Sequence, residues 1–292
     1  MRPADTARLL ALAAIWGASF IFMRVVAPAL GPVWTAEGRV LIGGLALAAW
    51  FALTGFSPQW RRHLRFYALV GMVNSAIPFS LYGFASIHLP ASLMAILNAT
   101  SPMFGLLLGA AFAGERITPH RIAGLLLGAA GVALIAWSSG GNAGGGIDAG
   151  AGPMFGWGVA ACLGASFAYG VTGVLIRRLG AGVPSRGIAV GAQLCAAVAL
   201  LPLLPLLPPA SMPSTMVTAN LVALGVVASG VAFILYFRLM TDIGVTRTLT
   251  VTFLIPLFAF LWGMLFLGET LTWGAAGGAL LILGGTLLVT RG

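Results

Sequence analysis

Charged side chains are scarce in this sequence. Only 7% of its 292 residues are charged, 60% are hydrophobic, and the mean hydropathy is +1.03. A soluble domain carries about 25% charged residues, because its surface has to face water. Fifteen basic and six acidic side chains cannot cover the surface of a 29.9 kDa chain. The scarcity excludes an ordinary soluble enzyme and indicates that much of the surface faces lipid.

Lysine is absent, and there are only two cysteines. Every basic residue is arginine, and the formal net charge is +9, a value that would also suit a nucleic-acid-binding protein. The positions of the arginines, given below, favour an explanation by membrane topology, so we expect no nucleic-acid partner. Cys162 and Cys195 both lie inside apolar runs, and we therefore expect no structural disulfide.

The sequence also lacks the motifs of a membrane enzyme, which is the alternative of a different class. His63, His88 and His120 are isolated and do not form the HExxH spacing of zinc proteases. There is no GxSxG nucleophile motif and no Walker motif, and no aspartate lies inside an apolar run. We therefore expect no catalytic residue, no metal and no cofactor.

Turn residues and charges divide the chain into ten apolar runs, each about as long as a helix that crosses a bilayer. The first five are predicted near residues 8–27, 33–54, 66–87, 91–112 and 119–139. The other five are predicted near 154–178, 185–207, 216–239, 245–267 and 272–290. The predicted fold class is an all-α membrane protein with ten transmembrane helices.

The two halves of the chain repeat each other. GASF at residues 17–20 recurs at 164–167, and GERIT at 114–118 corresponds to GETLT at 268–272. Beyond the GASF motif, a constant spacing of 154 residues relates Tyr82 to Tyr236, Pro102 to Pro256 and GERIT to GETLT. We predict one five-helix repeat in residues 1–139, a glycine-rich external linker in 140–153, and a second repeat in 154–292. Because five is odd, the second repeat would enter the membrane from the opposite side, as two inverted repeats around a central cavity.

Arginine positions predict the orientation. With the N-terminus inside, 13 of the 15 arginines fall in cytoplasmic segments, as the positive-inside rule requires. These are Arg2, Arg8, Arg61, Arg62, Arg65, Arg116, Arg121, Arg177, Arg178, Arg186, Arg238, Arg247 and Arg291. We therefore predict a multi-pass protein of the bacterial inner (plasma) membrane with both termini in the cytoplasm. Trp34, Trp50, Trp60, Trp137 and Trp273 lie near span ends and are predicted interface anchors.

Ten spans in two repeats, together with WGASF at residues 16–20 and a proline followed by GERIT or GETLT, resemble the drug/metabolite transporter superfamily. More narrowly, the chain resembles its EamA family, which includes bacterial amino-acid and drug-metabolite exporters such as those of the YddG type. The resemblance covers about residues 8–290. It implies a secondary transporter that exports amino acids, aromatic or other neutral, and related small amphipathic metabolites.

Candidate substrate contacts are polar and aromatic residues at depths inside the membrane, because polar groups there are costly unless they face a cavity. For the serines and asparagines, hydrogen bonds between helices are the alternative. For the aromatic residues the alternative is packing against lipid. An aromatic wall would suit amphipathic cargo and cation–π contacts with an ammonium group. The predicted substrate-binding residues are Trp16, Ser19, Asn74, Phe79, Tyr82, Asn98, Trp157, Tyr169 and Trp262.

A second set of residues is predicted to gate the protein or line the exit path. Arg24, Glu37 and Arg39 are the charged residues within the spans, and they could form a mutual ion pair or attract a substrate carboxylate. His88, Pro102 and Pro256 complete this set. Glu115 and Glu269, at equivalent ends of the fourth and ninth spans, could cap the next helix or gate between the halves.

No carboxylate or histidine is predicted at the membrane midplane, so we expect transport without obligate proton coupling. The partners we expect are a small-molecule substrate and membrane lipid, with the chain acting as a monomer. Within the same fold, a drug-like cation or a nucleotide sugar is the alternative cargo. A nucleotide sugar would require several basic groups at midplane depth, and the sequence has none there.

Overall fold

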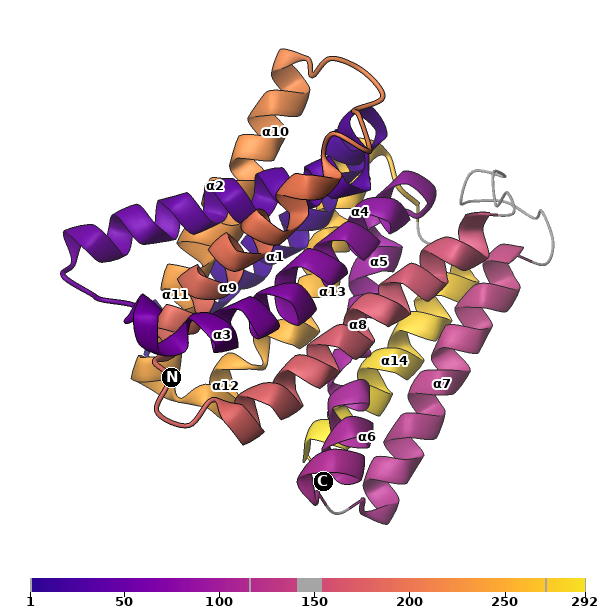
Figure 1. The fold of residues 1–292 in the computed structure, drawn as a ribbon. Coiled ribbons are helices and arrows are strands. Elements are labelled where there is room, and N and C mark those ends of the chain that lie inside the picture. The colour runs from indigo at the N-terminus through magenta and orange to yellow at the C-terminus, as the bar shows by residue number, and fades with distance from the viewer. Residues whose placement is uncertain (1, 116, 141–153, 271, 292) are drawn as a thin grey trace.

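The computed structural model describes residues 2–115, 117–140, 154–270 and 272–291, and helices form nearly all of it (Figure 1). The predicted linker, except for Gly140, lies outside the described residues, as does Arg116. The helices of the first half are α1 (Pro3–Leu30), α2 (Pro32–Leu53), α3 (Trp60–Gly71), η1 (Met72–Ala76), α4 (Ile77–His88), α5 (Ala91–Asn98), α6 (Ser101–Ala113) and α7 (Pro119–Gly140).

The second half follows the same order. Its helices are α8 (Met154–Leu179), α9 (Ser185–Leu200), η2 (Leu201–Leu203), α10 (Thr215–Gly225), η3 (Val226–Val231), α11 (Ala232–Ile243), α12 (Val245–Thr248), α13 (Val251–Leu267) and α14 (Trp273–Arg291). Within the described residues, nine helical stretches are long and apolar enough to cross a bilayer, and the shorter apolar α13 makes the tenth. The predicted fold class of ten helical spans is confirmed.

Several of the predicted spans are more complex than single α-helices, and the ninth is interrupted between Thr248 and Val251. The third and eighth spans each contain a π-helical segment, η1 and η3, whose first residues Met72 and Val226 are 154 positions apart. The fourth span is interrupted between Asn98 and Ser101, where α5 gives way to α6. A π-helical turn holds one extra residue, and such turns are frequent at functional sites.

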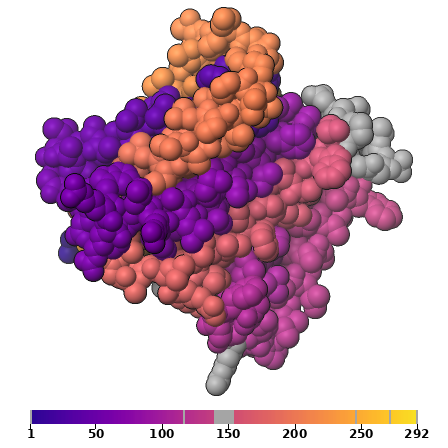
Figure 2. All heavy atoms as spheres, viewed as in Figure 1, coloured from indigo at the N-terminus to yellow at the C-terminus, as the bar shows by residue number. Residues whose placement is uncertain are grey.

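The two halves are packed into one another. Helix α1 packs on α13, and α8 packs on α6, so the first helix of each half lies against the fourth span of the other. Figure 2 shows segments of the second half lying between segments of the first half on one face of the molecule. The core is therefore shared, and neither half encloses the central side chains alone.

Glycines bring α7 and α14 together. A Cβ atom on Gly124 would lie 2.6 Å from the carbonyl oxygen of Gly285, and one on Gly131 would lie 2.7 Å from that of Gly278. The earlier glycine of α7 meets the later glycine of α14, and the later glycine of α7 meets the earlier glycine of α14. The two helices therefore run antiparallel. Both distances are too short for any side chain, so these glycines allow the close packing of α7 against α14.

Candidate functional site

A cluster of aromatic and polar side chains surrounds Arg39 of α2. The guanidinium carbon of Arg39 lies 3.9 Å from the ring centroid of Phe79, a cation–π contact, and its Nε donates to Ser229 Oγ at 3.2 Å. Arg39 is only 7% exposed. The ion pairs among the described residues do not include it. It is therefore a buried cation held by a ring and a hydroxyl, without a carboxylate.

Tyrosines extend this cluster towards the interrupted fourth span. Tyr82 and Tyr169 stack at 6.4 Å between centroids, and both are close enough to Arg39 to interact with it electrostatically. Tyr82 donates its hydroxyl to Asn98 Oδ1 at 2.8 Å. Four of the predicted substrate contacts, Phe79, Tyr82, Asn98 and Tyr169, thus lie in one region, together with Arg39. They come from α4, α5 and α8, and α2 supplies the charge.

Hydroxyl groups satisfy the backbone where the fourth span is interrupted. Ser166 and Thr286, from two other helices, donate to the carbonyl oxygens of Leu97 and Ala99 at 3.2 and 2.7 Å. Ser101 donates to the carbonyl oxygen of Asn98 at 2.7 Å. Because no water is available in hydrocarbon, these bonds allow a broken helix at this depth.

Gln193 of α9 belongs to this cluster, although the sequence analysis did not select it. It lies on the seventh span, the counterpart in the second half of the span that holds Arg39. A Cβ on Gly43 would meet Ser229 Cβ at 2.5 Å and Gln193 Oε1 at 2.7 Å, so both side chains converge on the same point of α2. Gln193 is 2% exposed, and neither polar atom of its amide has a hydrogen-bond partner among the described residues. The signal that could have identified it is a polar amide inside an apolar run, since such a side chain at that depth needs a polar partner.

Other predicted contacts hold helices together. Trp16 donates its indole N–H to the carbonyl oxygen of Ala228 at 3.2 Å and packs on Tyr236. Trp262 makes the matching bond to the carbonyl oxygen of Ala14 at 3.0 Å. Ser19 bonds within its own helix, to the carbonyl oxygen of Trp16 at 2.7 Å. Trp16 nevertheless adjoins the Arg39 cluster through η3, which contains both Ala228 and Ser229.

Three predicted residues lie away from the cluster. Trp157 is 65% exposed on the surface of α8, so its prediction as an interior contact was wrong. Hydropathy gives the depth of a residue but not the helix face on which it lies. Asn74 is half-buried within η1. His88, at the end of α4, packs on Phe84 with ring centroids 4.8 Å apart.

The charged residues predicted as a group do not form a mutual ion pair. Arg24 donates to the carbonyl oxygens of Ser86 and Ile87, at 3.0 and 3.5 Å, at the end of α4. Glu37 is 3% exposed, and neither carboxylate oxygen has a hydrogen-bond partner among the described residues. Glu37 and Arg39 are two positions apart and therefore leave α2 on different sides, which explains why the expected pair is absent.

The two predicted gating prolines occupy different places in their helices. Pro102 stands in the first turn of α6, where its missing N–H costs no hydrogen bond, whereas Pro256 lies inside α13. The interruptions also differ, because one falls before Pro102 at residues 99–100 and the other at residues 249–250. Equivalent sequence positions therefore have unequal local structure.

The Gly-Glu motifs end the fourth and ninth spans in the same way. Gly114 and Gly268 follow the last helical residue with φ of +69° and +65°, a conformation that favours glycine. The next N–H groups, of Glu115 and Glu269, bond back to the carbonyl oxygens of Gly109 and Gly263 at 3.1 and 3.0 Å. This is the local reason for the repeated motif.

The two glutamates differ in their partners. Glu269 bonds to the start of α5 in the other half, whereas Glu115 forms an ion pair with Arg177 near the end of α8. Neither caps the helix that follows it among the described contacts, so the prediction of capping the next helix was wrong. The alternative of a connection between the halves matches these contacts.

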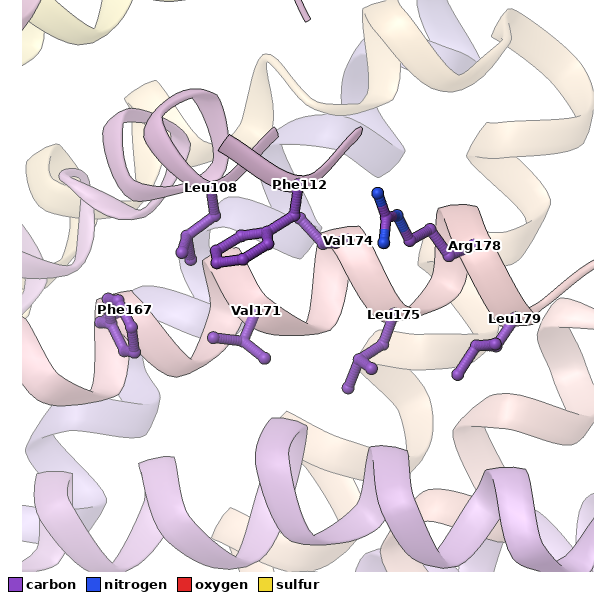
Figure 3. Close-up of a pocket in the computed structure, with 8 residues that line it drawn as sticks. All are labelled: Leu108, Phe112, Phe167, Val171, Val174, Leu175, Arg178 and Leu179. Atoms are coloured by element: carbon purple, nitrogen blue, oxygen red, sulfur yellow. The ribbon is translucent and has the colours of Figure 1, made fainter. Parts of the chain in front are cut away.

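A groove on the surface lies between α6 and α8, does not include Arg39 among its lining residues, and has a volume of about 430 Å³. Figure 3 shows Leu108 and Phe112 facing the side chains of α8, with Arg178 towards one end. The other lining residues are Phe167, Val171, Val174, Leu175 and Leu179. An apolar groove open at the side of a membrane bundle suits acyl chains better than a polar substrate.

Among the described residues, no group of three or more His, Cys, Asp or Glu side chains could hold a metal ion. The central cluster offers instead one fixed cation, one free amide and several aromatic faces. Such a set can bind a carboxylate and an apolar side chain at the same time, and it contains no nucleophile with an adjacent base.

Ten apolar helical spans around a buried polar cluster define a multi-pass integral membrane protein. A model of the EamA-like transporter family matches the sequence twice, over residues 7–137 and 156–291. The chain belongs to the EamA-like transporter family. It is therefore a membrane transporter and not an enzyme.

Two curated relatives agree with this assignment, and one solved structure shares the fold. The chain is 28% identical over 277 residues to a "probable terminal-alkyne amino-acid exporter" of Streptantibioticus cattleyicolor, covering 94% of this chain and 90% of that protein. It is 30% identical over 135 residues to the "uncharacterized inner membrane transporter YedA" of Escherichia coli K12, which spans 46% of this chain and 43% of YedA. A crystal structure with 22% identity superposes with a TM-score of 0.65, covering 99% of this chain and 96% of that one.

Proposed function

We propose that this protein exports amino acids, aromatic or other neutral, and related small amphipathic metabolites across the bacterial inner membrane by alternating access. The observation that carries the proposal is Arg39, a buried guanidinium without a carboxylate partner among the described residues. Burying an unpaired cation in hydrocarbon costs free energy, and a substrate carboxylate would form the missing ion pair with Arg39. The name of the amino-acid exporter relative points to the same chemistry.

The neighbours of Arg39 suit the rest of an amino acid. Gln193 has both a donor and an acceptor free, and it can therefore bind a carboxylate oxygen or an ammonium hydrogen. Phe79, Tyr82 and Tyr169 provide ring faces for an apolar side chain and for the ammonium group. A cationic drug would meet repulsion from Arg39. A nucleotide sugar would need more basic groups than this cluster contains.

Alternating access follows if the halves are inverted repeats, with residues 1–139 and 154–292 as the repeats and 140–153 as the linker. Antiparallel packing of α7 and α14, the fifth helix of each half, supports this arrangement. The arginine distribution supports cytoplasmic termini, and with this orientation Glu269 would lie at the external end and Glu115 at the cytoplasmic end. One chain supplies the whole cluster, so we propose that it functions as a monomer.

The experiment is transport in proteoliposomes with neutral, aromatic, cationic and acidic amino acids, with and without a pH gradient. We expect transport of neutral and aromatic amino acids, and poor transport of the corresponding amines that lack a carboxylate. Arg39→Ala should remove most of this activity, and Arg24→Ala should reduce it less. Transport of amines and amino acids at equal rates, or wild-type rates in both variants, would refute the proposal.

A further inference from the structure

Glu269 joins the two halves at one end of the bundle. Its carboxylate accepts hydrogen bonds from the backbone N–H groups of Ala91 and Ser92, at 2.7 and 3.1 Å, and from Ser92 Oγ at 2.8 Å. These groups begin α5, where N–H donors are otherwise unpaired and the helix dipole favours a negative charge. A carboxylate of the second half thus holds the first turn of a span of the first half.

Glu115 is the equivalent carboxylate at the other end. Its side chain also folds back on a glycine, because a Cβ on Gly109 would lie 2.8 Å from Glu115 Cδ, as one on Gly263 would lie 3.0 Å from Glu269 Cδ. Its partner, however, is Arg177. The residues equivalent to Ala91 and Ser92 begin the ninth span after Gly244, and Figure 1 shows α12 and α6 apart in the lower part of the view.

The two partnerships also differ in strength. The Glu269 bonds are charge-assisted, and three of them converge on one carboxylate in a part-buried place. The side chains of Glu115 and Arg177 are 24% and 56% exposed, so water weakens their ion pair. The Glu269 hydrogen bonds are therefore suited to keeping one end of the bundle closed. The Glu115–Arg177 ion pair is suited to breaking when Glu115 takes another partner.

We propose that Glu269 is the latch of the external gate and that Glu115 is its cytoplasmic counterpart, kept from closing its own end by Arg177. The proposal rests on the alternating access proposed above. To open outward, the Glu269 carboxylate leaves Ala91 and Ser92, and Glu115 leaves Arg177 and approaches the start of the ninth span. Both carboxylates lie at equivalent helix ends. Opening the external side therefore breaks the Glu269 bonds while the closing cytoplasmic side forms similar bonds to Glu115.

The test measures opening directly, in nanodiscs without substrate, so it does not depend on which compound is transported. Spin labels at His88 and Trp273 report the distance across the Glu269 end, and labels at His120 and Thr241 report the distance across the Glu115 end. The background carries Cys162→Ala and Cys195→Ala. Pulsed electron paramagnetic resonance then gives the populations of the two conformations.

Each substitution at the Glu269 end should change the ratio of outward-open to inward-open molecules in a stated direction. Glu269→Gln should raise the ratio of outward-open to inward-open molecules about tenfold, because charged hydrogen bonds contribute most of the latch. Gly263→Ala should act in the same direction while keeping the charge, because the added methyl displaces the carboxylate. Ser92→Ala, which removes one bond of the three, should give a smaller shift of the same sign.

The cytoplasmic variants separate a latch from a merely structural role. Arg177→Gln releases Glu115 and should also favour the outward-open state, whereas Glu115→Gln should favour the inward-open state. If Glu269→Gln and Gly263→Ala leave both distances at their wild-type values, or if Glu115→Gln shifts them as Glu269→Gln does, the latch is overturned. Absence of amino-acid transport together with the expected shifts would instead refute only the proposed substrate.

Discussion

Arg39 on α2 of the first half and Gln193 on α9 of the second half approach the same central region, yet only one of them is charged. Glu115 and Glu269 show the opposite relation, since the residue is the same but the partner differs. The glycines of α7 and α14 are equal both in sequence and in contact. The comparison separates positions that maintain the repeated framework from positions that give the two halves different chemistry.

Framework positions tolerate few substitutions because backbone atoms of the two helices meet there, and a backbone cannot move aside as a side chain can. The residue types at the central positions can differ between the halves. A substrate with two unlike ends is bound better by one arginine and one glutamine than by two arginines, which would repel each other. A repeated scaffold can therefore hold an asymmetric site.

The largest effect is expected where the halves are most alike. Gly124→Leu and Gly278→Leu, 154 residues apart, should each lower the free energy of unfolding by about 3 kcal/mol or more, since the new side chain meets backbone atoms of the facing helix. Thermal unfolding in detergent measures this change. Gly173→Leu is the control, because a Cβ there meets nothing within 4 Å. Unequal losses for Gly124 and Gly278 would show that the two halves are not equivalent at this interface.

Arg39→Gln should lower transport efficiency about a hundredfold, as expected for loss of a buried charge that pairs with substrate. Gln193→Leu should lower it about tenfold, since one hydrogen-bonding group is lost. The exchange Arg39→Gln with Gln193→Arg should recover part of the activity if the positions are equivalent around the substrate. Initial uptake rates across substrate concentrations measure this. An exchange that is no better than Arg39→Gln would show that the two positions are not interchangeable.

Ser229→Ala and Ser75→Ala form a matched pair 154 residues apart, both in π-helical segments and both buried. Ser229 orients the Arg39 guanidinium through its 3.2 Å bond, so its loss should weaken substrate affinity about fivefold. Ser75→Ala should change affinity less than twofold. Binding titration by tryptophan fluorescence compares the two variants, and equal losses would contradict a specific role for Ser229.

The smallest effect is expected from Glu37→Gln. If Glu37 is neutral in its buried place, replacing it by an amide changes little, and transport should remain independent of an imposed pH gradient. A pH-sensitive dye inside the proteoliposomes detects proton movement during transport. Substrate-driven acidification or alkalinisation that Glu37→Gln abolishes would show proton coupling through Glu37.

Much of the fold could be predicted, because each span is a local run of apolar residues and each Gly-Glu end is a local helix stop. The predicted site was less complete. Phe79, Tyr82, Asn98 and Tyr169 do lie around one region, but Trp157 lies on the surface and Gln193 was missed. Depth can be counted along a helix, whereas the direction a side chain faces depends on neighbours distant in sequence.

By itself, the scarcity of charge determined that this protein lives in a membrane, since a chain with 7% charged residues cannot present a wet surface. The repeat of 154 residues determined which positions correspond. Only the tertiary structure decided that Arg39 stands without a carboxylate while Glu37 lies apart from it, and that Glu269 holds α5 while Glu115 holds Arg177. A sequence specifies which groups exist, and packing between distant helices decides which of them meet.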